Sequence, residues 1–293
     1  MSPLSTSEVQ APKALDIQHD TDPAQDHGPA RRIPHLGHAL LFFSIAWLML
    51  NLCGAIVFAA AHIHTEEAAR MHPILALLAE ALSYALTLAI SWWLFPRLWG
   101  RSFLHGIQWN VLAAHRRWFW IVPIAIAMSA LAQFATHFVP EPKNSPVTAV
   151  LQSTAGAWLM TILGVLLAPL AEEIAFRGFL LPALATAYDW LALERTPAGF
   201  QRWQNSTMHS RAALVFATIF SSAPFALLHG AQLDYAWGGL GILYGVSLVL
   251  SIVRIRTHSV ACSTLMHAIY NLTVFAVVFA GTGGFRHMEK LLH

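Results

Sequence analysis

Three charged side chains interrupt a long apolar stretch in the segment AEEIAFRGF, residues 171–179. If this stretch is a helix, Glu173 and Arg177 lie one turn apart on the same face and can neutralise each other. Glu172 points about 100° away around the helix and lacks that partner. Because an ionised group inside a membrane costs roughly 2.5–3.5 kcal/mol, Glu172 requires a partner on another element, a water-filled cavity or a chemical role.

Two later apolar segments also carry polar side chains at helical spacing. In SSAPFALLHG, His229 follows Phe225 by one turn, and in STLMHAIYNL, Asn271 follows His267 by one turn. Each polar side chain is isolated on an apolar helix, so it should face the interior of a bundle or water. We therefore expect the two histidines and Asn271 to meet Glu172 around one cavity.

These four side chains suit a hydrolytic reaction. A carboxylate in a desolvated pocket can act as a general base toward water, and histidine and asparagine N–H groups can stabilise an oxyanion. No serine, threonine or cysteine stands in an evident nucleophile setting, which favours direct attack by water over an acyl-enzyme. The alternative is a catalytic zinc ion or another divalent metal held by Glu172, His229 and His267. Because the sequence lacks HExxH, we favour a site without metal or other cofactor.

The same residues also allow a purely structural explanation. Two carboxylates that share one arginine can fix the packing of helices without any chemistry, since buried ion pairs are often retained for specificity. A single histidine on an apolar helix is likewise more often a core residue than a catalyst. The combination of two such histidines with an unpaired glutamate favours a functional site.

The overall composition is typical of a membrane protein. Of 293 residues, 56% are hydrophobic and 11% are charged, whereas a soluble domain carries about 25% charged residues. The net charge of +2 is too balanced for a nucleic-acid-binding surface, so we expect no nucleic-acid partner. Cys53 and Cys262 lie in apolar runs without metal-binding spacing.

Seven apolar stretches are long enough, or nearly so, to cross a bilayer as helices. They predict an all-α, polytopic transmembrane helix bundle of about seven to eight spans, surrounded by membrane lipids. The stretches are 38–61, 74–96, 118–139, 153–185, 212–230, 237–253 and 259–281.

The distribution of basic residues between the connections predicts the orientation. Cytoplasmic loops are enriched in lysine and arginine, and one set of alternate connections holds most of them. We therefore expect a cytoplasmic N-terminus in a cell membrane, and the compact loops favour a bacterial inner membrane. The richer set holds Arg31, Arg32, Arg97, Arg101, Arg116, Arg117, Arg195, Arg202, Arg211, Arg254 and Arg256, and the poorer set holds Arg70, Lys143, Arg286 and Lys290.

Three motifs in this order on successive apolar helices resemble the CPBP family, the CAAX proteases and bacteriocin-processing proteins that are also called the ABI family. The motifs are EExxxRG from Glu172, FxxxH from Phe225 and HxxxN from His267. The resemblance covers roughly residues 150–280. It implies an intramembrane endopeptidase of the glutamic type, although a metalloendopeptidase was an earlier interpretation of the family.

The resemblance also implies a role for each matching residue. Glu172 corresponds to the glutamate that activates water, and His229 to the histidine that assists it. His267 and Asn271 correspond to the oxyanion site, so these four form the predicted catalytic set. The implied structural support consists of Glu173, Arg177 and Phe225.

These observations predict three regions: a disordered cytoplasmic tail at 1–35, scaffold membrane helices at 36–145 and a catalytic membrane domain at 146–285. The expected activity is cleavage of a peptide or protein substrate, membrane-anchored in some relatives, in peptide maturation or bacteriocin immunity. A transporter or channel with a Glu/His proton or ion path is one alternative. A non-catalytic immunity or interaction protein is the other.

Three further features bear on the site. Glu80, in LLAEALSYAL, is another intramembrane carboxylate, either structural or linked to a substrate or proton path. Pro169 and Pro182 are expected to bend the fourth span.

In the simplest topology Glu172 and His229 would differ in depth by more than about 10 Å. We therefore expect an interfacial segment at 147–158 and irregular backbone at 230–241.

Overall fold

The computed structural model describes residues 32–139 and 146–287, so residues 1–31 of the predicted tail lie outside the described part. All regular elements in the described part are helical, and seven are long and apolar enough to cross a membrane. The predicted all-α bundle is therefore confirmed. The spans are α1 Leu36–Ala60, α3 Pro73–Trp99, α5 Val111–Thr136, a composite span Thr154–Leu191, α11 Arg211–Leu228, α12 Trp237–Thr257 and α13 Val260–Gly281.

Short helices connect the spans. The third span starts at Val111 rather than at 118, because the Asn110 side chain caps it by accepting a hydrogen bond from Ala113 N at 2.9 Å. The predicted interfacial segment 147–158 is divided between a separate short helix and the start of the composite span at Thr154. The short helices are α2 Glu66–Arg70, α4 Phe103–Gly106, α6 Pro146–Leu151, α10 Pro197–Asn205 and the 3₁₀ turn η3 Ala231–Leu233.

The composite span changes its helical form twice. It runs through α7 Thr154–Ile162, the π-helical turn η1 Leu163–Leu167, α8 Ala168–Glu173, the π-helical turn η2 Ile174–Leu180 and α9 Leu181–Leu191. Pro169 and Pro182 each stand at the second position of the α-helix that follows a π turn. Proline lacks the N–H that continues an α-helix, and π turns are frequent at functional sites. The prolines thus mark the two places where this span departs from an α-helix.

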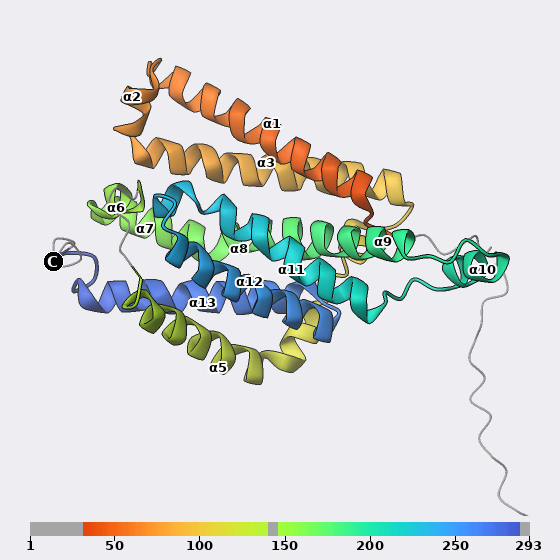
Figure 1. Cartoon of the computed structure of the whole chain (residues 1–293). Helices are drawn as coiled ribbons and strands as arrows, with labels where there is room; N and C mark the ends of the chain where they lie inside the picture. Colours follow the sequence, from red (N-terminus) through yellow and green to blue (C-terminus); the bar gives the residue numbers. More distant parts are fainter. Residues whose placement is uncertain (1–31, 140–145, 288–293) are drawn as a thin grey trace, which may run out of the picture.

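The composite span lies in the middle of the bundle (Figure 1). The helices α1 and α3 pack on each other as an antiparallel pair and contact η2, α8 and α9. On the other side α13 contacts η1 and α8, and α5 packs along α13. The helix α11 lies between α9 and α12. The segments with the sequence motifs therefore converge on the centre of the bundle.

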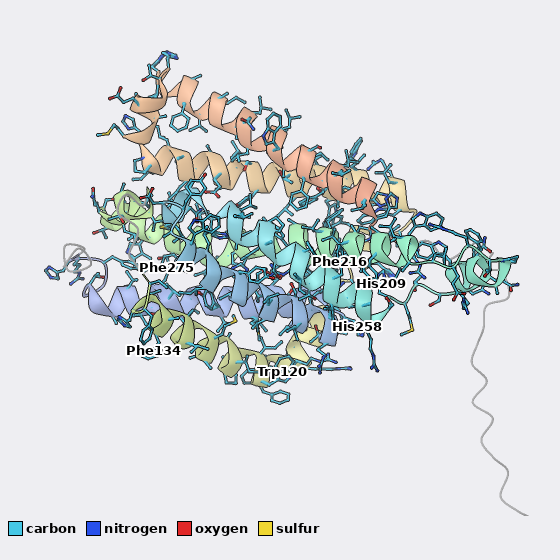
Figure 2. All side chains as sticks on the ribbon, in the orientation of Figure 1. Trp120, Phe134, His209, Phe216, His258 and Phe275 are labelled. Atoms are coloured by element: carbon cyan, nitrogen blue, oxygen red, sulfur yellow. The ribbon has the colours of Figure 1, made fainter. Side chains whose placement is uncertain are left out.

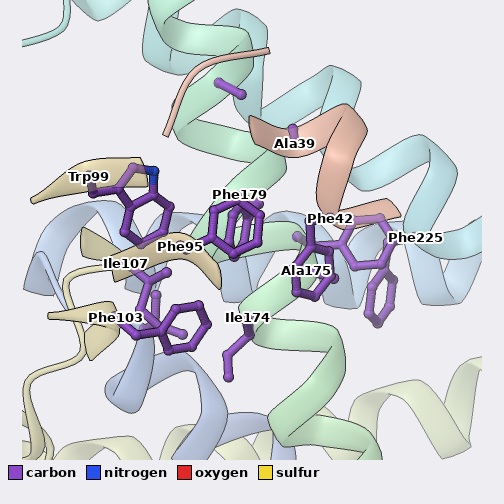
Figure 3. Close-up of a cluster of buried hydrophobic side chains, with 13 residues drawn as sticks. Ala39, Phe42, Phe95, Trp99, Phe103, Ile107, Ile174, Ala175, Phe179 and Phe225 are labelled. Carbon is purple, nitrogen blue, oxygen red and sulfur yellow. The ribbon is translucent and has the colours of Figure 1, made fainter. Parts of the chain in front are cut away.

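An aromatic cluster joins the α1–α3 pair to the composite span. The ring of Phe179 in η2 stacks on Phe42 of α1 with 4.4 Å between centroids, and lies 4.7 Å from Phe95 of α3. Trp99 and Phe103 complete the contact around Phe179 (Figure 3). Burial of such large rings supplies much of the packing energy, so this cluster fixes α3 against the helix that carries the EExxxRG motif.

The outer faces of the spans are apolar and exposed in the isolated chain. Phe134 projects from the outer margin of α5 and is 60% exposed (Figure 2). Trp47 of α1 is 68% exposed. Because these side chains sit on helices long enough to cross a membrane, lipid is the medium that would cover them.

The connections sort to two ends of the bundle. The helix α10 lies at the opposite end from α2 and α6 (Figure 1). The segment that precedes α1 lies at the same end as the connection before α11, since Arg32 contacts Ser206. The cellular orientation stays a prediction. Arg254 was counted among the loop residues, but it is a buried member of the last turn of α12 and donates to Gln108 Oε1 at 2.8 Å.

A polar cluster at the end of the composite span fixes the segment that precedes α1. Arg32 donates to the carbonyl oxygen of Ser206 at 2.6 Å and lies 3.6 Å from an Asp189 carboxylate oxygen. Its guanidinium also covers the ring of Trp203 at 3.8 Å. His209, in the connection from α10 to α11 (Figure 2), has its Nδ1 3.0 Å from Asp189 Oδ2. Burial lowers the pKa of His209 from its usual value of 6.5, against the attraction of Asp189.

This shift predicts a loss of stability in mild acid. The unfolded chain takes up a proton at His209 below about pH 6.5, while the folded protein resists it, so the free energy of unfolding should fall as pH falls from about 6.5. We expect His209→Asn to reduce the difference in Tm between about pH 7.5 and 5.5, measured in detergent micelles. His64→Asn, at an exposed histidine in the loop before α2, is the matched control. Equal pH dependence in wild type and both variants would contradict this assignment.

Candidate active site

Glu173 and Arg177 form a buried ion pair next to Glu172. Arg177 Nη1 donates to Glu173 Oε1 at 2.8 Å, and both side chains are almost fully buried. Arg177 Nη2 donates to the backbone oxygen and to the hydroxyl of Ser247 in α12, at 2.9 and 2.8 Å. The guanidinium also lies 4.7 Å from the ring centre of Phe225. The predicted pairing of Glu173 with Arg177 is present, and it ties the composite span to α11 and α12.

His267 of α13 bridges the two glutamates. Its Nδ1 lies 3.1 Å from Glu173 Oε1, and its Nε2 lies 3.9 Å from Glu172 Oε2. The ring is 4% exposed and packs edge-on against Phe225, with 5.8 Å between centroids. The contact with Glu173 orients the imidazole, so Nε2 is the nitrogen turned toward Glu172.

His229 directly follows α11 and is held by the backbone of that helix. Its Nδ1 lies 2.9 Å from the carbonyl oxygen of Phe225. A carbonyl can only accept a hydrogen bond, so Nδ1 must be the donor. In the neutral ring Nε2 is then an acceptor. Phe225 thus contacts both histidines and the arginine, which agrees with a supporting position.

Asn271 uses part of its amide to bind the composite span. Its Nδ2 donates to the carbonyl oxygen of Gly164, in the π turn η1, at 2.7 Å. The amide nitrogen carries two hydrogens, so one donor remains after this bond. Any side chain at position 164 would meet the ring of Phe275, because an added Cβ would lie 2.9 Å from a ring carbon. The close approach of α13 to η1 therefore needs Gly164.

One cavity of about 270 Å³ is lined by all four predicted catalytic residues. Glu172 comes from α8, His229 from the end of α11, and His267 and Asn271 from α13. The expected problem of depth does not arise, because Glu172 and His229 line the same space. Within the predicted irregular segment 230–241, only 230–236 lies outside α-helix, and it brings Gln232 to the cavity.

The helix α3 contributes Glu80, whose role the sequence left open, and Tyr84, which the sequence did not single out. Glu80 and Tyr84 line the cavity beside Glu172, and the Tyr84 hydroxyl donates to Glu80 Oε1 at 2.8 Å. Their i,i+4 spacing was visible in the sequence, but nothing in it indicated which helix they would face. Ser247, which holds Arg177, lacked any signal of its own.

A second, wider cavity meets the first at these residues. It measures about 860 Å³ and lies between α1, α3 and α8, with mostly apolar walls. Glu80, Tyr84, Glu172, His229 and Gln232 line both cavities. The carboxylate of Glu172 is therefore accessible from an apolar groove as well as from the central cavity.

The arrangement does not match a preformed metal site. Among the described residues, no group of three or more histidine, cysteine, aspartate or glutamate side chains is placed to hold a metal ion. His229 Nδ1 contacts the carbonyl oxygen of Phe225, and His267 Nδ1 contacts the carboxylate of Glu173. Histidines that bind a metal usually hold their second ring nitrogen in this way. The mechanism below uses the side chains alone.

The comparison with known families agrees with this geometry. Residues 154–273 match the family model described as Type II CAAX prenyl endopeptidase Rce1-like. The chain carries a CPBP-family domain. No curated protein and no solved structure matches the chain.

The match indicates a CAAX-protease-like membrane endopeptidase, a class of enzyme that acts on a peptide or protein substrate. It extends from α7 into α13 and contains all four cavity residues that the motifs singled out. The helices α1 and α3 lie outside the matched range. The matched range therefore supplies most of the lining of the cavity, and α3 adds a further wall.

Proposed function

We propose that the protein hydrolyses peptide bonds within the membrane by direct attack of a water molecule that Glu172 activates. The observation that carries this proposal is the shared cavity, in which Glu172, His229, His267 and Asn271 come together from three spans. Glu172 is available as a base because Arg177 binds the neighbouring Glu173 instead. The CPBP-family match supports an endopeptidase over other hydrolases.

In this mechanism Glu172 accepts a proton from the water as its oxygen attacks the peptide carbonyl. His229 assists by accepting a hydrogen bond from the same water at Nε2, since Nδ1 donates to the backbone of Phe225. When the carbon–nitrogen bond breaks, Glu172 returns the proton to the departing nitrogen. The same carboxyl group thus acts first as base and then as acid.

The negative charge on the carbonyl oxygen is stabilised from α13. In its protonated form His267 donates from Nδ1 to Glu173 and from Nε2 toward the cavity. Asn271 has one amide hydrogen left after its bond to Gly164. Two fixed donors in a site shielded from bulk water form an effective oxyanion site. An amide donor contributes little to a proton path, so Asn271 favours hydrolysis over transport.

The test is a comparison of the peptides in membranes that carry either wild-type protein or Glu172→Gln. We expect a defined set of cleavage products to be present with wild type and lost with the variant at equal protein abundance. Glu67→Gln, at an exposed residue in α2, is the control and should leave the products unchanged. Identical peptide sets in wild type and Glu172→Gln would reject the protease and favour a transport or binding role.

We infer the cellular setting from the same features. The end of the bundle with α10 faces the cytoplasm, with the N-terminus on that side, because it holds most of the basic connections. The seven apolar spans support a multi-pass protein of the cell membrane, and compact loops favour a bacterial inner membrane. An enzyme of this kind would act in peptide maturation or in bacteriocin immunity.

A further inference from the structure

The carboxylate of Glu80 has no part in the mechanism above, although it lines the same cavity. It comes from α3, outside the residues that match the family model. Glu80 lines the central cavity together with Glu172 and His229, so it lies beside the groups that handle the water. We propose that Glu80 accepts a hydrogen bond from the departing amine and stabilises the positive charge that develops there.

The geometry gives Glu80 a fixed position and spare capacity to accept hydrogen bonds. Its Oε1 accepts the Tyr84 hydroxyl at 2.8 Å, and an ionised carboxylate can accept about four hydrogen bonds. The Ser83 hydroxyl donates to the backbone oxygen of Glu80 at 2.7 Å. The helix α3 is itself held against the composite span by the aromatic cluster around Phe179. The carboxylate is therefore oriented before a substrate arrives.

The proposed hydrolysis, on which this inference rests, creates the charge that Glu80 would meet. A bond forms between the water oxygen and the carbonyl carbon, and one water proton passes through Glu172 to the nitrogen as the carbon–nitrogen bond breaks. The second water proton leaves the new carboxyl group and completes the ammonium form of the amine product. An amide nitrogen is nearly neutral, whereas this product is a cation. A carboxylate in an apolar cavity stabilises such a change strongly.

Besides Glu172, Glu80 is the carboxylate that lines the central cavity. Glu173 is bound by Arg177 and His267. His267 and Asn271 face the carbonyl oxygen in the proposed mechanism, and Glu172 carries the transferred proton. Glu80 stands on the wall formed by α3, and that wall faces the apolar groove through which a membrane-embedded chain could leave.

The test compares two substrates that differ only in the atom that departs. One is a quenched fluorescent peptide with a sequence whose cleavage depends on Glu172, and the other is its depsipeptide, with an ester at the cleaved bond. An ester releases an alcohol, which gains no positive charge. In proteoliposomes containing the full chain, we expect Glu80→Gln to lower kcat for the peptide about 100-fold with little change in KM. We expect kcat for the depsipeptide to change less than about threefold.

Ser91→Ala is the matched control, because Ser91 is a buried polar residue of α3 that lines neither the central cavity nor the wider groove. It should leave both rates unchanged. Tyr84→Phe should reduce peptide cleavage in the same selective way but less strongly, and Glu80→Asp should restore part of it. These two variants carry the test if Glu80→Gln does not fold.

The outcomes separate this inference from the proposed function. An equal loss of peptide and ester cleavage in Glu80→Gln, or no loss of either, would overturn the role of Glu80 while leaving the protease intact. Absence of any Glu172-dependent cleavage would instead overturn the proposed function itself.

Discussion

Glu172→Gln is expected to lower kcat/KM for peptide cleavage by about 10³-fold or more, because the amide cannot accept a proton from water. Glutamine has nearly the same shape, and among the described residues the ion pair of Glu172 is the 3.9 Å approach of His267 Nε2. The variant should therefore fold normally and still bind substrate. The measurement is the initial rate of cleavage of a Glu172-dependent peptide by purified protein in proteoliposomes, with Tm as the check of folding.

Two controls sharpen this result. Glu172→Asp keeps the carboxylate but withdraws it by one methylene, so it should retain more activity than glutamine. A chelator should leave wild-type activity unchanged if no metal takes part, whereas inactivation reversed by zinc would favour the metalloendopeptidase alternative. Full activity of Glu172→Gln in the purified protein would refute the assignment of the base.

Arg177→Leu is expected to cause the largest loss of stability, about 3–5 kcal/mol, because it leaves the buried carboxylate of Glu173 without its cation. The substitution also removes two hydrogen bonds to Ser247 and the contact with the Phe225 ring. The free energy of unfolding can be measured by titrating the detergent-solubilised protein with a denaturing detergent. Activity should fall as well, since His267 depends on Glu173 for its orientation.

The chain offers a matched comparison in Arg202, which pairs with Glu194 while both side chains are 68% exposed. Arg202→Leu should change the unfolding free energy within experimental error, because solvent screens an exposed pair. The double variant Glu173→Leu/Arg177→Leu should be less destabilised than Arg177→Leu, since no unpaired charge is left. A loss for Arg177→Leu no greater than for Arg202→Leu would contradict the buried-pair interpretation.

The sequence alone determined the elements of the fold and the residue types of the site. Apolar stretches of membrane-spanning length specify helices, because a backbone in lipid must satisfy its own hydrogen bonds. The spacing of Glu173 and Arg177 specified their pairing, because i and i+4 share a helix face. The same rule placed His267 and Asn271 on one face of α13. These are local properties, and periodicity in the sequence is enough to read them.

Only the tertiary structure decided how the helices meet. The irregular turn after His229 brings that residue to the same cavity as Glu172, although their separation along a simple topology suggested different depths. The bond from Asn271 to Gly164 depends on the approach of α13 to the composite span. Glu80 was visible as an intramembrane carboxylate, but the rotation of α3 determines whether it faces lipid or the cavity. That rotation is fixed by packing around Phe179, which no pattern within a single helix specifies.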